Sequence, residues 1–162
     1  MSIEKVKTYL AAFGREKDVM EFPVSSATVG LAAQALSVEP ARIAKTLSFQ
    51  GKDESHCILV VAAGDARIDN SKFKRFFGMK ARMLGPGKVA ELTGHAVGGV
   101  CPFANPEGVE TYLDVSLQRF STVFPACGSG NSAIELSCDE LFRYARAAGW
   151  VDVTAGETQN AL

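Results

Sequence analysis

Two stretches of the chain carry residue types that could bind and polarise a carbonyl group. One is the loop Gly98-Gly99-Val100-Cys101-Pro102, and the other is Lys45. Adjacent glycines let the backbone approach a ligand without a Cβ in the way, and Pro102 stiffens the far end of the loop. Backbone N–H groups held in such a loop can donate hydrogen bonds to a carbonyl or an oxyanion. The same composition is typical of a plain structural turn, so the loop alone leaves both interpretations open.

Lys45 lies at the start of an expected strand, between Ile43-Ala44 and Thr46-Leu47-Ser48-Phe49. A lysine among apolar residues either extends its stem along the surface to water or is held in a pocket. The residues around Lys45 are compatible with either arrangement.

A nucleophilic thiol is a third possibility, because His95 and Cys101 belong to the same loop. A histidine in contact with the thiol could activate it. Nothing in the sequence orients the imidazole, however, and we interpret Cys101 as part of a pocket wall. Cys57 and Cys138 are interpreted as buried thiols that pack as small apolar groups.

The elements that must position these residues follow from hydrophobic spacing and from glycine and proline positions. Helices are expected over residues 3–13, 28–36, 70–77, 86–92 and 139–148, with Thr28 and Asp139 as N-caps, Gly78 and Gly149 as stops, and a short helical turn over 40–43. Strands are expected over residues 19–24, 46–49, 56–63, 112–115, 123–127 and 133–136.

The segment 94–108 is irregular and rich in glycine and proline. Loops of that length inside a compact domain are usually functional or disordered, and the apolar residues in this one indicate that it is packed. Strands and helices alternate without a regular βαβ rhythm, which indicates a mixed α+β (α/β) domain. We expect one domain over residues 1–153 and a flexible tail over 154–162.

Composition narrows the classes of protein that fit. The 162 residues suit one core. With 17 basic and 18 acidic side chains the net charge is −1, so any nucleic-acid contact needs a local basic patch. No apolar run approaches the roughly 18 residues that span a bilayer, and the N-terminus carries charges where a signal peptide is apolar. We therefore expect a cytoplasmic protein without membrane contact. Four cysteines without a CxxC pair, and two histidines, make a zinc site unexpected.

Three motifs in this order carry a resemblance. They are Ile43-Ala44-Lys45-Thr46-Leu47, then Gly94 to Phe103 with its G-x-x-x-P loop, and then the turn Ala126-Cys127-Gly128. Together they resemble the YbaK/EbsC family of prolyl-tRNA-synthetase-associated editing domains, over nearly the whole chain. The resemblance implies a YbaK-like fold, with a mixed, largely antiparallel sheet flanked by helices. It also implies a metal-independent hydrolase, without a cofactor, that cleaves the ester between a wrong amino acid and tRNA.

The resemblance also implies roles for individual residues. Lys45 would bind the terminal adenosine end or the carbonyl side of the substrate, and the loop amides would polarise the ester carbonyl while a water attacks, positioned by the substrate's own ribose hydroxyl. The expected catalytic set is Lys45, Gly98, Gly99, Val100, Cys101 and Pro102. The expected substrate pocket is formed by Thr28, Gly94, Val97, Phe103, Gly128 and Ser129.

The chain departs from the family pattern at three positions. Cys101 stands where many members have proline or serine, and Ala104 where glycine is frequent. Ala133 occupies the place where members acting on cysteinyl-tRNA tend to carry an acidic residue, although Glu135 follows two positions later. A small aliphatic amino acid such as alanine is therefore at least as plausible a substrate as cysteine.

Basic residues cluster between positions 72 and 88, either as a solvated helix face or as a patch for tRNA phosphates. The expected tRNA-binding residues are Lys72, Lys74, Arg75, Lys80 and Arg82. Asp65, Arg67, Asp69 and Asn70 either line the site mouth or form turns and caps. The expected partners are the aminoacylated 3′ end of tRNA and a prolyl-tRNA synthetase, and not DNA. A non-catalytic module that binds tRNA or a synthetase is the alternative function.

Overall fold

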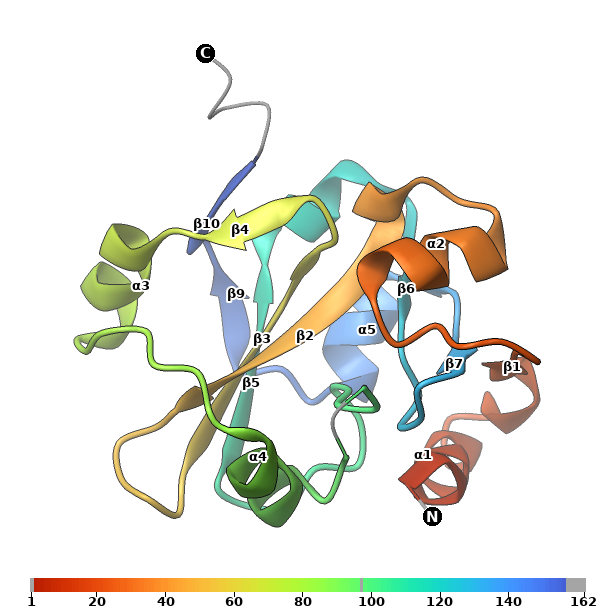
Figure 1. Cartoon of the computed structure of the whole chain (residues 1–162), viewed down its shortest axis with the longest axis horizontal. Coiled ribbons are helices and arrows are strands. Elements are labelled where there is room, and N and C mark those ends of the chain that lie inside the picture. The colour runs from red at the N-terminus through yellow and green to blue at the C-terminus, as the bar shows by residue number, and fades with distance from the viewer. Residues whose placement is uncertain (1, 97, 157–162) are drawn as a thin grey trace.

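A six-stranded sheet forms the centre of the molecule in the computed structural model, which describes residues 2–96 and 98–156 (Figure 1). The strands lie in the order β8-β6-β2-β3-β5-β9, and the pairs β1-β7 and β4-β10 form two small ribbons. The strands are β1 Met20–Glu21, β2 Ile43–Gln50, β3 Cys57–Ala63, β4 Ala66–Ile68, β5 Val109–Asp114, β6 Thr122–Pro125, β7 Ser132–Ala133, β8 Leu136–Ser137, β9 Gly149–Val151 and β10 Thr154–Gly156. The helices are α1 Ser2–Ala11, α2 Val29–Leu36, α3 Asn70–Phe77, α4 Pro86–Thr93 and α5 Cys138–Tyr144, with 3₁₀ turns η1 Glu16–Asp18, η2 Pro40–Arg42 and η3 Val115–Arg119.

The expected mixed sheet flanked by helices is confirmed. Among the described strands, the pairings β1-β7, β4-β10, β2-β3 and β6-β8 are antiparallel, whereas β2-β6, β3-β5 and β5-β9 are parallel. The hairpin expected around the turn at residues 50–54 is present, with Ala44 opposite Ala63 and Gln50 opposite Cys57. Every residue of β3 is buried, as its continuous apolar run predicts for a central strand.

One edge of β2 is left open in its middle. Near its start β2 pairs with β6, through Ile43 and Ala44. Near its end the same edge pairs with residues 82–84, because the Gln50 N–H donates to the Arg82 carbonyl and the Leu84 N–H to the Ser48 carbonyl, at 2.8 and 3.1 Å. Among the described residues, no strand pairs with this edge over residues 45–47. The sheet therefore has a gap beside Lys45.

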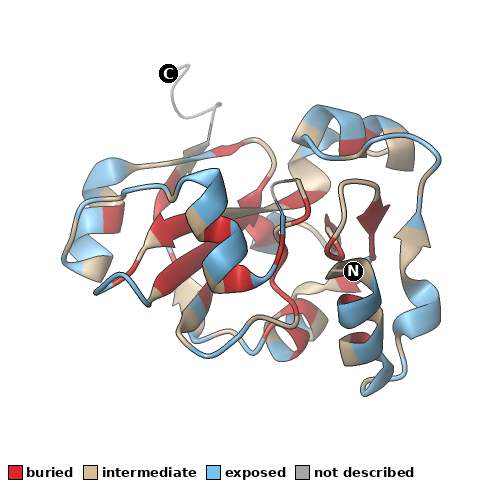
Figure 2. Cartoon of the chain, turned by 60° about the horizontal axis from the view of Figure 1, so that its bottom comes forward, coloured by how far each residue is buried: buried red, intermediate tan, exposed pale blue. Residues whose placement is uncertain are grey.

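Helices cover both faces of the sheet, and each face has its own apolar core. Val6 and Leu10 of α1 pack in one cluster with Leu141 of α5, and Phe73 of α3 packs in a second cluster on Phe49 of β2. Figure 2 shows the buried residues gathered on the strands, with exposed residues on the outer faces of the helices. In the described part of the chain, no helix has the length and apolar character that a membrane crossing needs.

Several expected boundaries are confirmed residue by residue. The Thr28 hydroxyl caps α2 by accepting a hydrogen bond from the Leu31 N–H at 3.2 Å. Helix α3 covers the expected residues 70–77, with Asp69 as its N-cap and Gly78 in the left-handed conformation at its end. An N-cap stabilises a helix because the first N–H groups have no acceptor within the helix. A glycine after the last turn is favourable because the chain often leaves the helix with positive φ.

The C-terminal quarter of the chain departs from expectation. The single strand expected over 133–136 is wrong, because β7 pairs with β1 while β8 pairs with β6, so the chain bends between them. Helix α5 is capped by Ser137 rather than Asp139, in a capping box with Glu140. It ends at Tyr144, and Gly149 begins β9 instead of stopping a helix.

The first residues of the expected flexible tail form a strand instead. Residues 154–156 form β10, which pairs with β4 so that Gly156 lies opposite Ala66. The buried Asp114 carboxylate fixes this end of the chain by accepting hydrogen bonds from the Val153 N–H and the Thr154 hydroxyl, at 2.9 and 2.8 Å. Residues 157–162 lie outside the described residues.

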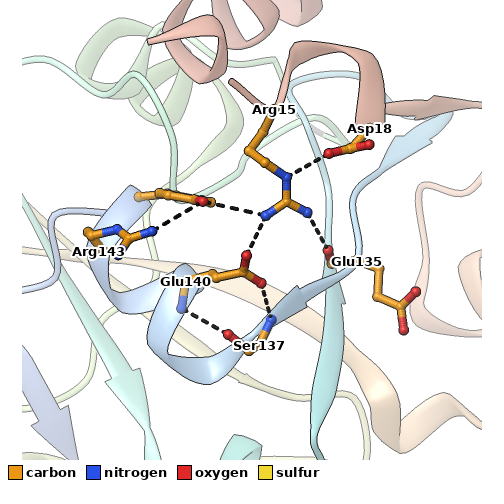
Figure 3. Close-up of polar contacts among 7 residues, drawn as sticks. Arg15, Asp18, Glu135, Ser137, Glu140 and Arg143 are labelled. Atoms are coloured by element: carbon orange, nitrogen blue, oxygen red, sulfur yellow. Dashed lines mark hydrogen bonds and ion pairs between the residues drawn. The ribbon is translucent and has the colours of Figure 1, made fainter. Parts of the chain in front are cut away.

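A polar network around Arg15 fastens the N-terminal helix to α5 (Figure 3). Its guanidinium bonds the Asp18 carboxylate at 2.6 Å and the Glu140 carboxylate, and it reaches the Tyr144 hydroxyl at 3.4 Å. Glu140 also closes the capping box at Ser137. One cation therefore connects the chain after α1 with the first and last turns of α5.

We expect Arg15→Met to lower the free energy of unfolding by about 1–2 kcal/mol, because hydrogen bonds between charged groups contribute more than neutral ones. Urea denaturation followed by circular dichroism measures the loss. Lys7→Met is the matched control, because it removes the exposed ion pair between Lys7 and Glu21, in which α5 takes no part. Equal midpoints for the two variants would show that the Arg15 network adds nothing beyond a surface ion pair.

Candidate functional site

A pocket of about 430 Å³ opens at the unpaired edge of β2, between α2 and α4. It is built from six segments that are distant in the sequence. Its lining residues are Ser26, Ala27, Thr28, Val29 and Ala32, then Ile43 to Ser48, then Met83, Leu84, Pro86 and Val89, then Gly98 and Val100, and finally Phe124, Ala126, Ser132 and Ala133. Lys45 and the Gly98–Val100 part of the loop therefore meet in one cavity.

Lys45 is half-buried in this pocket, and backbone carbonyls hold its ammonium group. Its Nζ donates to the carbonyl of Ala66, the first residue of β4, and lies 3.4 Å from the carbonyl of Gly64, in the turn before β4. These carbonyl oxygens orient the ammonium group. Lys45 thus brings a cation to the edge of the pocket.

Thr46 contributes a second set of polar groups. Alternate residues of a strand direct their backbone N–H and C=O groups to the same edge. Ser48 and Gln50 bond residues 82–84 through that edge, so the backbone of Thr46 faces the gap. The Thr46 hydroxyl oxygen is buried without a hydrogen-bond partner among the described residues. No feature of the sequence singles out Thr46 beside the lysine.

The glycine loop is packed against the turn at residues 128–130. Gly98 has φ +89°, which favours glycine, and a Cβ on Gly99 would come within 2.8 Å of the Gly128 carbonyl oxygen. A Cβ on Gly98 would lie 3.4 Å from that of Ala27. Gly99 is therefore required by the close approach of the Gly128 backbone, and Gly98 is favoured by its positive φ.

Only part of the loop is placed to donate hydrogen bonds to a ligand. The Gly99 N–H donates to the Ala96 carbonyl at 2.9 Å, inside the turn. The Val100 N–H donates to no acceptor within the described residues, and Val100 lines the pocket. Val97 lies outside the described residues. The Val100 amide is therefore a candidate main-chain donor to a bound carbonyl oxygen.

Cys101 lies beneath the loop rather than in the pocket wall, so its interpretation as a wall residue is corrected. The side chain is fully buried in the core that α1 and α5 cover, and burial raises the pKa of the Cys101 thiol to about 12. Its Sγ does approach His95 Nε2, at 3.6 Å. That nitrogen also bonds the Phe103 carbonyl at 2.9 Å, and a carbonyl can only accept, so Nε2 carries the proton. His95 therefore cannot take a proton from the thiol through this nitrogen.

Of the remaining expected site residues, one lines the pocket, and the others lie behind or beneath the glycine loop or at the end of α4. Thr28 lines the pocket while it caps α2. Gly128 and Ser129 lie in the turn behind the loop, where the Ser129 hydroxyl donates to Ser132 at 2.8 Å. Pro102 and Phe103 are buried beneath the loop, and Gly94 is the left-handed C-cap of α4.

Sequence reasoning missed most of the pocket walls. Ser26 and Ala27 reach the site because Ser26 bonds the Gly130 carbonyl at 2.7 Å. Met83 and Leu84 reach it through their pairing with the end of β2. No local motif marks these residues, since their position depends on contacts between distant segments.

The basic residues begin at the rim of the pocket and extend toward α3. Arg82 precedes the pocket residue Met83, and Lys74 and Lys80 line a separate depression. Lys74, Arg75, Lys80 and Arg82 are exposed. Lys72 instead bonds the Asp152 carboxylate at 3.1 Å and the Thr154 carbonyl at 2.8 Å, so it serves as a tie to β10.

Comparison with known proteins identifies a matching family model and several similar proteins. The model of the aminoacyl-tRNA editing domain matches residues 24–144. The uncharacterized protein YwhH of Bacillus subtilis (strain 168) is 56% identical over 153 residues, which are 94% of this chain and 97% of that protein. A crystal structure described as a candidate trans-editing enzyme for prolyl tRNA synthetase superposes with a TM-score of 0.84 at 32% identity, over 96% of this chain and 98% of that one. The hypothetical protein APE2540 superposes with a TM-score of 0.80 at 31% identity, over 93% and 99%.

The thiol geometry predicts the order in which the cysteines react. In the folded protein at neutral pH, we expect iodoacetamide to modify the half-buried Cys138 before Cys101, because Cys101 is shielded and its thiolate is disfavoured. Mass spectrometry of a time course measures the order, and a sample in denaturant gives the unprotected rates. Modification of Cys101 ahead of Cys138 in the native protein would instead indicate an activated nucleophile.

Proposed function

The chain belongs to the aminoacyl-tRNA editing domain family, and from that membership we propose that it is a trans-editing hydrolase that deacylates mischarged tRNA. The substrate proposed is proline tRNA that carries a small wrong amino acid, alanine-like or cysteine. The observation that carries the proposal is that Lys45, Thr46 and Val100 line one pocket. The proposed setting is the cytoplasm, where tRNAs are charged.

The proposed reaction is attack of water on the ester that joins the amino acid to the terminal ribose. The Val100 N–H donates to the ester carbonyl oxygen, where negative charge develops in the transition state. The Lys45 ammonium binds the polar end of the substrate and adds positive charge beside it. The ribose hydroxyl next to the ester positions the water. An aminoacyl ester is already activated, so positioning and carbonyl polarisation supply most of the acceleration, and the proposal includes no metal.

The pocket walls favour a small amino acid. Val29, Ala32, Phe124 and Ala133 present apolar surface, and the buried Ala133 places no charge at the position where an acidic side chain would bind a polar substrate. An apolar pocket separates substrates that differ by one methylene by only about 1–3 kcal/mol. We therefore propose alanine as the preferred group, with cysteine as a weaker substrate.

A deacylation panel tests the proposal. We expect the protein, with EDTA present, to release the amino acid from alanyl- or cysteinyl-tRNA for proline faster than buffer does, and to leave prolyl-tRNA intact. Lys45→Ala should lower kcat/KM by about 10²-fold, because it removes a charge that acts at the reacting centre. Release of the radiolabelled amino acid measures both.

Cys101→Ala is the matched control, since the thiol lies outside the pocket, and we expect it to stay within about twofold of wild type. Full activity of Lys45→Ala would refute the mechanism. Binding of tRNA without any deacylation across the panel would favour the alternative, a non-catalytic tRNA- or synthetase-binding module.

The basic residues at the pocket rim are proposed to hold phosphates of the tRNA acceptor strand. We expect Lys74→Ala/Lys80→Ala/Arg82→Ala to weaken tRNA binding and to reduce the slope of log affinity against log salt by about 2, because each phosphate contact releases counterions. Fluorescence anisotropy at several salt concentrations measures the slope. Lys72→Ala is the comparison and should change it less, since Asp152 already neutralises Lys72. An unchanged slope in the triple variant would remove these residues from the tRNA surface.

A further inference from the structure

One buried side chain closes the base of the glycine loop. His95 stands at the start of the loop, and its Nε2 reaches the carbonyl of Phe103, at the end of the loop, at 2.9 Å. The imidazole therefore closes a ring of backbone that contains Gly98, Gly99 and Val100. His95 is 0% exposed, so water does not compete for this bond.

Helix α1 holds the other side of the imidazole. Burial lowers the pKa of His95, so the ring is neutral at neutral pH. Because Nε2 carries the proton that binds the Phe103 carbonyl, Nδ1 of the neutral ring is an acceptor. The Ser2 hydroxyl bonds Nδ1, and with this tautomer the hydroxyl is the donor. A continuous series of hydrogen bonds therefore runs from Ser2 through the ring to Phe103.

The backbone on both sides of the ring is anchored as well. The His95 N–H donates to the Thr93 hydroxyl at 3.0 Å, and that hydroxyl donates to the Val89 carbonyl of α4 at 2.7 Å. Near the far end of the loop, the Asn105 side-chain amide donates to the Cys101 carbonyl at 3.0 Å. The two ends of the loop are therefore fixed, and the His95 side chain joins them.

The first turn of α1 also supports the turn behind the loop. A Cβ on Gly128 would come within 2.8 Å of the Ser2 carbonyl oxygen and 2.9 Å of the Val6 side chain. Gly128 is also the residue whose backbone lies against Gly99. The start of α1 therefore contacts both supports of the loop, which are His95 at its base and Gly128 behind it.

We propose that His95 is a positioning residue: by joining the Phe103 carbonyl to Ser2 of α1, it holds the loop in the conformation that presents the Val100 N–H to the ester carbonyl. The catalytic part of this inference rests on the proposed deacylase function. His95 does not line the pocket, so it acts through the backbone that it closes. Loss of the Phe103 bond would slow the chemical step more than it weakens tRNA binding, because the Val100 contact strengthens as negative charge develops.

Two amide substitutions separate the two bonds of the ring. The amide nitrogen of glutamine lies as many bonds from Cβ as Nε2 does, so His95→Gln keeps a donor for the Phe103 carbonyl. The shorter asparagine reaches only the place of Nδ1, so His95→Asn keeps only the Ser2 side. We expect His95→Asn to lower the maximal single-turnover rate by about tenfold and to leave the half-saturating protein concentration within about twofold of wild type. His95→Gln should stay within about threefold in both quantities.

Release of the radiolabelled amino acid from the best substrate of the panel measures both quantities. His56→Gln is the matched control, since it replaces the other histidine, which bonds Asp53 in the turn between β2 and β3. An unimpaired His95→Asn, equal impairment of His95→Gln and His95→Asn, or a loss confined to the half-saturating concentration would overturn the proposal. A role in packing alone predicts that both variants lose activity in proportion to their thermal stability.

A second readout needs neither activity nor a variant. NMR of isotope-labelled imidazole nitrogens should show His95 protonated at Nε2 and unprotonated at Nδ1 at neutral pH, with an Nε2 proton that exchanges slowly with water. His56 gives the other imidazole signal and serves as the reference. A His95 ring protonated at Nδ1 instead could not donate to Phe103 and would overturn the inference. If wild type deacylates nothing in the panel, the proposed function fails, and the tautomer alone decides whether His95 closes the loop.

Discussion

The site depends on a strand edge that the sheet does not close. Strand β2 has neighbours at both ends of one edge and none, among the described residues, over positions 45–47. Unpaired backbone groups beside a buried sheet need partners, and here they face a pocket instead of another strand. The surrounding segments are arranged as the walls of that gap. The sheet thus supplies both the rigid base of the site and its polar groups.

The sequence predicted the elements whose signals are local. The β2–β3 hairpin, α3 with Gly78 at its end, and the Thr28 cap of α2 were all readable from apolar spacing and capping residues. The split between β7 and β8 was not readable, because it depends on which distant strands they meet. The end of α5 was misplaced because Arg146 adopts φ +51° without a glycine to mark the turn.

The candidate site was predictable to a similar degree. Lys45 and the glycine loop could be named from the sequence, and the structure brings them to one pocket. Their surroundings could not be named. Cys101 faces the core, in the cluster that contains Val6 of α1, and the sequence alone does not show that orientation. Met83 enters the site only because it pairs with Phe49, which is distant in the sequence. The residue types indicated the chemistry of the site, whereas contacts between distant segments decided which residues line the pocket.

The strand β10 has a consequence for how the protein is made. The Ala66 carbonyl that holds Lys45 belongs to β4, and its strand partner opposite Ala66 is Gly156. A domain generally folds as a unit, and β10 is the last of the described elements in chain order. The support for the lysine is therefore completed only when translation of these residues has finished.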